Sequence, residues 1–328
     1  MAQPLCKSFG VPTITLVPTM KIKNKWNLPD TLVNLAERDP YSKGGADFSV
    51  TQLIDSPKIS YLQEKHDHEI EVDITQSFWS LVGRAMHNVC EGGAEDHHII
   101  EERMFMLIDG KTVSGAIDVQ EVLDDKHVNI YDYKFTSAWA VQRVKEDWER
   151  QLNMYAQLVR SCKGMEVNKL FIVAIIRDWN RHKVGMKGYP PAPVQVIPIV
   201  KWPARHTIQY IRERVDAHTT ARSLLSNGSA YGGCSDEERW KRNDVHAVYV
   251  NGSKRASKLF KDKEQAERLR DELCKKLPSS TVVRSETRPG AFVRCEGNWC
   301  MVREWCDQWA AMEKYEEEED EGDGSGCY

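Results

Sequence analysis

Apolar side chains recur at helical spacing in two segments between residues 48 and 93. The first, residues 48–62, begins with Ser49 and Thr51, either of which can cap a helix, so we expect a short capped helix there. In the second, residues 77–93, apolar side chains follow three- and four-residue steps up to a Gly-Gly pair, which predicts an amphipathic helix. Its apolar positions are Phe78, Leu81, Val82, Met86 and Val89.

Period-two alternation replaces the helical pattern beyond residue 98. The alternating segments are residues 99–109, 112–123 and 127–135. The pairs Asp109-Gly110 and Asp124-Asp125 separate them and are typical of tight turns between antiparallel strands. The pattern therefore predicts a three-stranded antiparallel meander.

A helix and two further strands follow the meander in the hydropathy pattern. Residues 137–161 are rich in good helix formers, with Ser137 as the predicted cap. Residues 169–176 form a continuous apolar run, which predicts a strand buried on both faces, and residues 194–200 predict another strand. A helix is expected near residues 204–225. Helices and strands in this order predict a mixed α/β core.

The sequence changes character after residue 228. Residues 245–260 predict a hairpin that turns at Asn251-Gly252, and a helix and a strand follow, which gives a small ββαβ module. Residues 1–45 lack periodicity, and the acidic end has almost nothing to bury, so we expect an irregular extension and a disordered tail. The predicted organisation is an extension (1–45), a core (46–228), a cysteine-containing C-terminal module (229–312) and an acidic tail (313–328).

Composition narrows the class of protein. The 328-residue chain is 41% hydrophobic and 29% charged, as soluble globular proteins are, and it has no apolar run long enough to cross a bilayer. We expect no secretory signal and no membrane association, hence a cytoplasmic protein. Of the net charge of −4, residues 313–328 contribute −7, so residues 1–312 carry +3. That mildly basic part permits binding to nucleic acid.

The candidate chemistry lies in the predicted meander. Asp118 interrupts an apolar strand, and Asp132 and Lys134 are two residues apart on the next strand, so their side chains project from the same face. Carboxylates that meet at a partly buried place repel each other, and a hard divalent cation such as Mg²⁺ or Mn²⁺ resolves the repulsion. The lysine would face an anionic phosphate or a nearby attacking water. The competing interpretation is an Asp–Lys ion pair on a solvated strand.

Four motifs in order resemble one known family. Gly83–His87 (GRAMH) is followed by GAID with Asp118, DYK with Asp132 and Lys134, and QLNMY at residues 151–155. Over residues 46 to 215 the chain resembles the RecB-type branch of the PD-(D/E)XK nucleases, which includes phage recombination exonucleases and CRISPR-associated spacer-processing nucleases. The resemblance implies a restriction-endonuclease-like mixed sheet flanked by helices, and DNA hydrolysis that depends on Mg²⁺ or Mn²⁺.

The resemblance also assigns roles to individual residues. The implied metal ligands are His87, Asp118, Asp132 and the carbonyl oxygen of Tyr133. Lys134 would be catalytic together with the two aspartates, and Gln151 and Tyr155 would contact DNA or orient the site. Gln151 and Tyr155 are four residues apart, which places them on one helical face. Glu101 is a further candidate on the site side of the first predicted strand, with a solvated face as the alternative.

Basic and aromatic residues on and beyond the predicted long helix could contact a nucleic acid. The basic candidates are Arg143, Lys145, Arg150, Arg177, Arg181 and Lys183. The aromatic candidates are Trp139, Trp148 and Trp179. The former would bind phosphates and the latter would stack on bases of a single strand, whereas the alternative for the tryptophans is simple core packing.

The nine cysteines include a cluster near the C-terminus. Cys295, Cys300 and Cys306 lie within twelve residues, and Cys234 precedes the ββαβ module. Related nucleases hold an iron–sulfur cluster with one cysteine ahead of the nuclease motifs and three after them, but Ser56 stands where the first is expected here. Cys234 could replace it, so the alternatives are a [4Fe–4S] cluster, a Zn²⁺ ion or buried free thiols.

Three hypotheses about function follow from the motifs. The first is a DNA exonuclease that acts on DNA ends in phage recombination, repair or defence, with a recombination or single-strand-annealing protein as partner. The second is a catalytically silent DNA-binding or assembly protein, which the presence of Asp118, Asp132 and Lys134 disfavours. The third is a restriction-like endonuclease. The oligomeric state is left open by the sequence.

Overall fold

A computed structural model describes residues 5–6, 21–37 and 43–313. The chain forms two compact units, Met1–Tyr231 and Gly232–Tyr328, and each is described by itself below. The acidic segment predicted to be disordered lies outside the described residues, apart from Glu313. Within the described ranges, no helix is both long enough and apolar enough to cross a membrane.

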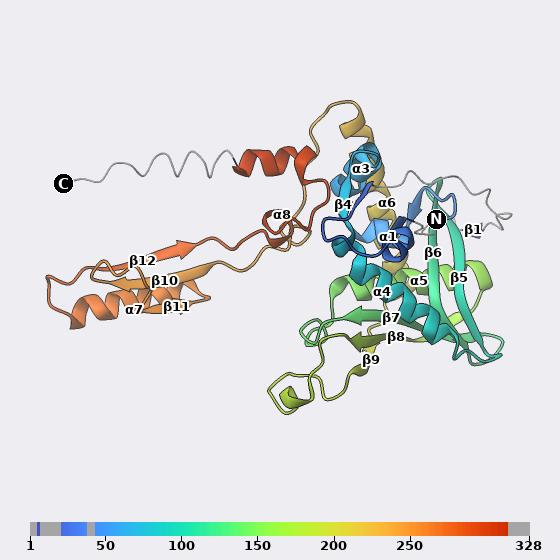
Figure 1. The fold of residues 1–328 in the computed structure, drawn as a ribbon, viewed down its shortest axis with the longest axis horizontal. Coiled ribbons are helices and arrows are strands. Elements are labelled where there is room, and N and C mark those ends of the chain that lie inside the picture. Colours follow the sequence, from blue (N-terminus) through green and yellow to red (C-terminus); the bar gives the residue numbers. More distant parts are fainter. Residues whose placement is uncertain (1–4, 7–20, 38–42, 314–328) are drawn as a thin grey trace. The chain divides into compact units, whose positions relative to one another are not determined.

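A seven-stranded mixed sheet is the centre of the first unit (Figure 1). The strand order is β1-β5-β6-β7-β8-β9, and β3 pairs with β6 off this path. The strands are β1 (Leu5–Cys6), β3 (Phe48–Ser49), β5 (His98–Ile108), β6 (Lys111–Val122), β7 (His127–Thr136), β8 (Glu166–Ile176) and β9 (Val194–Ile199). A short parallel pair lies outside it: β2 (Lys21–Lys23) and β4 (Glu71–Asp73).

The predicted meander is confirmed as β5, β6 and β7, paired antiparallel in that order. Asp109 and Gly110 both adopt positive φ (47° and 80°) at the β5–β6 turn, a conformation that glycine adopts without strain. At the β6–β7 turn the carboxylate of Asp124 accepts the backbone N–H groups of Lys126 and His127. β8 runs parallel to β7, so both strands end at the same edge of the sheet.

Helices cover both faces of the sheet. The helices of this unit are α1 (Asp30–Glu37), α2 (Val50–Ile54), α3 (Pro57–His66), α4 (Ile74–Glu91), α5 (Glu146–Lys163) and α6 (Ala204–Ser226). Asp132 of β7 contacts Gln151 of α5, whereas Phe135 of the same strand lies next to Gly83 of α4. Residues an odd number apart on a strand point to opposite faces, so α4 and α5 lie on opposite sides of β7.

The core of the unit lies mainly between the sheet and α5. Its fully buried members include Ile117 and Ile130 from the strands and Leu152 and Leu158 from α5. A Cβ atom added to Gly115 would meet the Leu158 and Tyr155 side chains at 2.7 and 2.8 Å. Glycine at this position therefore lets α5 approach β6 closely.

Helix capping follows the sequence. Ser49 caps α2 by accepting the N–H of Gln52 and forms a capping box with it, which confirms one of the two predicted caps. The helix predicted over residues 77–93 is confirmed as α4, which begins three residues earlier because Asp73 and Gln76 form a second capping box. Gly92 is its C-cap, as expected.

Three sequence expectations are wrong. The single helix expected over residues 48–62 is divided into α2 and α3, which Asp55 and Ser56 separate. The long helix does not begin at Ser137: residues 137–145 form turns, and α5 begins at Glu146, where Glu146, Asp147 and Glu149 favour the positive end of the helix dipole. The N-terminal extension is not irregular throughout, because residues 21–37 contain β2 and α1. The apolar side of α1 packs on Ile74 and Leu81 of α4, a contact that a weakly periodic sequence conceals.

The second unit contains the predicted ββαβ module. A three-stranded antiparallel sheet of order β11-β10-β12 carries the single helix α7. Their bounds are β10 (Val245–Val250), β11 (Lys258–Phe260), α7 (Lys263–Lys276) and β12 (Val283–Arg288). Asn251 and Gly252 both have positive φ after β10, as the predicted turn requires. Two short elements follow: α8 (Val293–Glu296) and the 3-10 helix η2 (Arg303–Trp305).

Candidate active site

Asp118 and Asp132 lie where β6 and β7 separate. Pairing between the two strands ends at Val119 and Tyr131, which lie one residue after Asp118 and one residue before Asp132. Beyond this point the Asp118 carboxylate takes the place of a strand partner, since its Oδ2 accepts the backbone N–H of Tyr133 at 2.7 Å. Both side chains are buried, Asp132 almost completely. The fork between the strands therefore presents two carboxylates close together.

Glu101 occupies an irregular position on β5, opposite this fork. Its neighbours Ile100 and Glu102 pair regularly with Val119 and Ile117, so Glu101 stands opposite Asp118. Its φ is +49°, in the left-handed region that residues other than glycine rarely adopt. Such a conformation costs about 1–3 kcal/mol and persists where the surrounding structure holds it. Here it directs a half-exposed carboxylate toward His87 of α4.

His87 joins the two carboxylates. Its Nδ1 lies 3.6 Å from Glu101 Oε1 and 3.5 Å from Asp118 Oδ2. Its Nε2 lies 3.0 Å from the carbonyl oxygen of Tyr133. A carbonyl oxygen only accepts, so Nε2 carries a proton, and in the neutral ring Nδ1 offers its lone pair to the side where the carboxylates lie. Histidine ligands of metal ions are held in this way by a second hydrogen bond.

Asp132 faces a lysine and an amide from the other side. Lys134 Nζ lies 2.6 Å from Asp132 Oδ2, and Gln151 Nε2 donates to Asp132 Oδ1 at 3.2 Å. The same amide nitrogen donates to the hydroxyl oxygen of Tyr155 at 2.9 Å. Gln151 and Tyr155 thus lie on one face of α5, as their spacing predicts, and act as one hydrogen-bonded pair behind Asp132.

The electrostatics of the site reflect buried like charges. Burial, reinforced by the charge of Asp132, raises the pKa of Asp118 to about 7. The carboxylate of Glu101 raises the pKa of His87, although burial works in the opposite direction. Burial also acts to lower the pKa of Lys134, but the charges of Asp132 and Asp118 outweigh it and the pKa lies above its ordinary value. The site is short of positive charge.

The donor set fits a hard divalent cation. Among the described residues, the one group of three or more His, Cys, Asp or Glu side chains close enough to share an ion is His87, Glu101 and Asp118, with ligand atoms within 4.8 Å of one another. We call these three residues the hard-ligand cluster. Two carboxylates and an imidazole match the ligand preferences of Mn²⁺, and carboxylates and water those of Mg²⁺.

Comparison with known families decides the class of the protein. The sequence profile described as the PD-(D/E)XK nuclease superfamily matches residues 55–307, more than half of the chain. The chain belongs to the PD-(D/E)XK nuclease superfamily. Its mixed sheet flanked by helices is the restriction-endonuclease-like fold that the sequence predicts. Membership in this superfamily makes the protein a nuclease by class.

The chain was also compared with curated proteins and with solved structures. No curated protein matches the chain. Among solved structures, the chain is similar to SSO0001 at 15% identity and a TM-score of 0.42, over 57% of this chain and 84% of that one. It is also similar to a provisionally assigned exonuclease from Eubacterium rectale at 14% identity and a TM-score of 0.30, over 64% of this chain and 78% of that one.

The structure places the predicted site residues of the nuclease in one region, where each makes contacts with others of the set. The Tyr133 carbonyl accepts from His87, and Asp132 is engaged by Lys134 and Gln151. Glu101, a further candidate from the sequence, lies in the hard-ligand cluster with His87 and Asp118. The sequence signal for Glu101 was its place in an alternating strand, which does not reveal the positive φ.

Several candidate nucleic-acid contacts are used within the protein. The Trp148 side chain is buried in the core, and Trp179 Nε1 donates to the Pro190 carbonyl at 3.0 Å. Arg150 forms ion pairs with Glu146 and Asp147 on its own helix. Trp139, by contrast, is 71% exposed.

The four cysteines belong to the second unit, where Cys295 lies in α8 and the other three lie outside helices and strands. Arg303 donates to the carbonyl oxygens of Cys295 and Cys300 and accepts the N–H of Cys306, so these three residues are neighbours. Burial raises the pKa of Cys300. The Gln308 amide bonds both backbone groups of Cys234, at 2.8 and 3.1 Å. Cys234 is therefore held by Gln308, which lies two residues after Cys306 in the sequence. We call these four residues the cysteine cluster.

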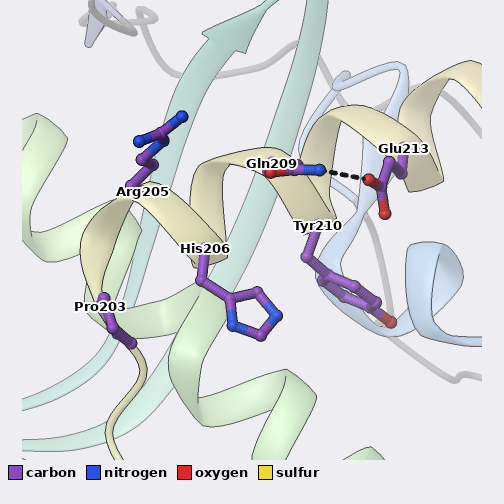
Figure 2. A pocket seen from close by; sticks show the side chains of 6 residues that line it. All are labelled: Pro203, Arg205, His206, Gln209, Tyr210 and Glu213. Carbon is purple, nitrogen blue, oxygen red and sulfur yellow. Dashed lines mark hydrogen bonds between the residues drawn. The ribbon is translucent and has the colours of Figure 1, made fainter.

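A shallow pocket of about 450 Å³ lies on α6, and none of the hard-ligand residues lines it. Its lining residues are Pro203, Arg205, His206, Gln209, Tyr210 and Glu213. Figure 2 shows the Gln209 amide bonded to Glu213 and the Arg205 side chain pointing away from the His206 and Tyr210 rings. Trp202 stacks on His206 with ring centroids 4.7 Å apart, so these rings pack on each other.

Proposed function

We propose that this nuclease hydrolyses phosphodiester bonds of DNA with the help of Mg²⁺ or Mn²⁺ held at the fork between β6 and β7. The observation that carries the proposal is the meeting of the hard-ligand cluster with the Asp132–Lys134 pair. Three ligand side chains from α4, β5 and β6 converge, and a lysine lies beside them on β7. Superfamily membership supports the reaction class.

His87, Glu101 and Asp118 would hold the cation, with Asp132 as a further carboxylate within electrostatic reach. When bound, a divalent cation polarises the phosphodiester and lowers the pKa of a coordinated water. Deprotonated Asp118 and neutral His87 are needed for that binding. The positive charge would also act against burial and the repulsion from Asp132, which raise the pKa of Asp118.

Lys134 and Gln151 act on this chemistry from the other side. The Lys134 ammonium stays protonated because two carboxylates raise its pKa, so it can stabilise charge that develops on a phosphate oxygen. Its side chain is one quarter exposed, which leaves it accessible to a substrate. Gln151, bonded to both Asp132 and Tyr155, is a positioning residue that fixes the carboxylate.

An exonuclease that acts on DNA ends in recombination, repair or defence is the specific form of the proposal. A recombination or single-strand-annealing protein would be its partner. The alternatives are a restriction-like endonuclease and a catalytically silent DNA-binding protein. The intact arrangement of Asp118, Asp132 and Lys134 supports an active enzyme over the silent one.

The test uses the purified full-length chain with end-labelled single- and double-stranded DNA in Mg²⁺, Mn²⁺ or EDTA. We expect degradation with either ion and none in EDTA. Release of mononucleotides from an end supports the exonuclease, whereas internal fragments support the endonuclease. RNA of the same sequence tests the substrate class. Intact DNA in both ions would contradict the proposed function.

We further propose that the cysteine cluster holds a structural [4Fe–4S] cluster or Zn²⁺ ion. Three neighbouring thiols and a fixed Cys234 supply soft donors, which such centres prefer over Mg²⁺. In the described chain, no three of the four thiols have sulfur atoms all within 4.8 Å of one another, the spacing that suits a single ion. A multi-iron cluster holds its thiolates further apart than a zinc ion does. Elemental analysis and an absorption spectrum of anaerobically purified protein test this, and protein free of both iron and zinc would contradict it.

A further inference from the structure

Two loops meet at the sheet edge next to the candidate active site. β7 and β8 are parallel, so the loop after β7 (residues 137–145) and the loop after β8 (residues 177–193) leave the same edge. They are joined by a hydrogen bond of 2.7 Å from the Ala138 N–H to Asp178. Gly188 lies against the side chain of Gln142. Lys134 is two residues before the end of β7, so the loops begin directly beside it.

These loops carry a concentration of exposed positive charge. Their basic residues are Arg143, Lys145, Arg177, Arg181, Lys183 and Lys187, and Asp178 is their one acid. All six basic side chains are exposed, and none of them forms an ion pair with any described residue. Elsewhere on this unit basic side chains often pair with carboxylates, as Arg150 and Arg160 do. Basic side chains without acidic partners, next to a site for an anionic substrate, favour the binding of a polyanion.

Exposed aromatic rings accompany this charge. Trp139 is 71% exposed and Trp79 of α4 is 50% exposed. The Arg177 guanidinium lies over the Trp79 ring, 4.7 Å from its centroid, while the backbone N–H of Arg177 bonds Thr136 at 2.9 Å. Arg177 is thus held at both ends, and a stacked guanidinium keeps its donors available for a phosphate.

The distance from the hard-ligand cluster suits a chain of nucleotides. Trp79, Gly83 and His87 are four residues apart in turn, so they follow one face of α4. At 1.5 Å per residue, Trp79 lies about 12 Å along the helix from His87. Trp79 and Gly83 both lie against Phe135, and His87 lies against Tyr133, so this face runs along β7.

We infer that residues 137–145 and 177–193, together with Trp79, form a surface that binds the single-stranded nucleic acid next to the scissile phosphate. We call it the two-loop surface. Its basic side chains bind successive phosphates, Arg177 is fixed for this by Trp79, and Trp139 stacks on an unpaired base. Bases inside a duplex are paired and stacked on both sides, so the stacking contact favours a single strand. This inference rests on the proposed action of the site on nucleic acid.

Binding is tested separately from hydrolysis by fluorescence anisotropy of labelled oligo-dT with the full chain in EDTA. We expect Trp139→Ala to weaken binding about fivefold to a hundredfold, the range for one stacked base. Trp26→Ala is the matched control, since Trp26 is also 71% exposed and lies outside the surface. Arg177→Lys keeps the charge and loses the stacking on Trp79, so a smaller loss than for Arg177→Ala is expected.

A triple variant measures the phosphate contacts. Replacing Arg181, Lys183 and Lys187 by alanine should lower the slope of log affinity against log salt by about 2, because each neutralised phosphate of a single strand contributes about 0.7. The control replaces three exposed basic residues elsewhere on the unit, Lys65, Lys169 and Arg205, and should leave the slope unchanged. The fold of each variant is checked by its cooperative thermal unfolding.

The outcomes separate this inference from the proposed function. Cleavage by wild-type protein together with unchanged binding by the two-loop variants would overturn the inference and leave the function standing. Equal losses on blunt duplex and on oligo-dT would overturn the assignment to a single strand. A wild-type protein that neither cleaves nor binds DNA would overturn both.

Discussion

The hard-ligand cluster of the first unit and the cysteine cluster of the second are held in place by different means. Asp118 and Glu101 lie on strands of twelve and eleven residues, respectively, whose register is fixed, and His87 lies on an 18-residue helix. Cys295 and Cys306 lie in or next to elements of only three or four residues. Hydrogen-bonded strands and helices can position ligands before an ion arrives, whereas short turns gain order from the ion itself. The comparison predicts a preformed catalytic site and a cysteine region that depends on its metal.

The largest effect should separate the two clusters. Asp118→Ala removes a ligand and the partner of the Tyr133 N–H, so hydrolysis should fall about a thousandfold or more, beyond the loss typical of one preorganised group. Cys300→Ser should leave hydrolysis per folded molecule near that of the wild type while it lowers iron or zinc content and thermal stability. Parallel loss of hydrolysis in both variants would show that the two clusters are not independent.

Replacement of Lys134 tests whether this residue acts in hydrolysis or in metal binding. Lys134→Ala should reduce hydrolysis about 10²–10³-fold at saturating metal, since the ammonium stabilises developing charge. Mn²⁺ binding, followed by electron paramagnetic resonance, should persist in this variant because Lys134 is not in the hard-ligand cluster. A variant that loses Mn²⁺ binding but regains full activity at high Mn²⁺ would instead assign Lys134 a role in metal binding.

Gln151 should have a smaller effect because it acts through Asp132. Gln151→Ala should cost about 10–100-fold in activity or metal affinity, the usual range for a group that orients a ligand. Gln157→Ala is the matched control, since Gln157 is also a buried glutamine of α5 but bonds Ser161 and Arg160. Equal activity losses in the two variants would indicate a general effect on α5.

A separate effect concerns stability and its pH dependence. The pKa of Asp118 rises from 3.8 to about 7 on folding, so its contribution to stability is lost as pH rises between these values. Asp118→Asn should therefore stabilise the metal-free protein at pH 8, by a few kcal/mol at about 1.4 kcal/mol per pKa unit, and much less at pH 4. Thermal unfolding in EDTA measures the difference.

Asp47 provides a control of opposite sign. Hydrogen bonds and charge from Thr112 and Lys111 lower the pKa of Asp47 against the effect of burial. The contribution of Asp47 to folding stability is present above its unfolded pKa and is lost as pH falls, so Asp47→Asn should destabilise the protein at pH 8.

A divalent cation should stabilise wild-type protein more at pH 8 than at pH 5.5, because protons compete for Asp118 and His87. Destabilisation by Asp118→Asn at pH 8 would contradict the electrostatic account.

Local patterning predicted the parts of the fold that carry strong periodicity. Alternation over residues 99–135 gave the meander with its turns, and the i and i+2 spacing of Asp132 and Lys134 placed both on one face of β7. The four-residue spacing of Gln151 and Tyr155 likewise predicted their shared helical face. These features depend on residues close together in the sequence, so they can be predicted from the sequence.

Features that depend on tertiary contacts could not be predicted in the same way. Residues 137–145 do not join α5, and the Ala138 N–H instead bonds Asp178, forty residues away in sequence. The role of Glu101 depends on a positive φ that no local pattern signals. The helix α1 is stabilised by its packing on α4, which no local pattern signals.

Asp132→Ala tests the central claim most directly, because Asp132 links the ligand side of the site to Lys134 and Gln151. The measurement is the rate of hydrolysis of end-labelled DNA at saturating Mg²⁺ or Mn²⁺, with cooperative unfolding as the check on the fold. The account predicts a folded protein whose rate does not exceed that of the wild type in EDTA. Full activity of the Asp132→Ala protein would contradict the assignment of this site.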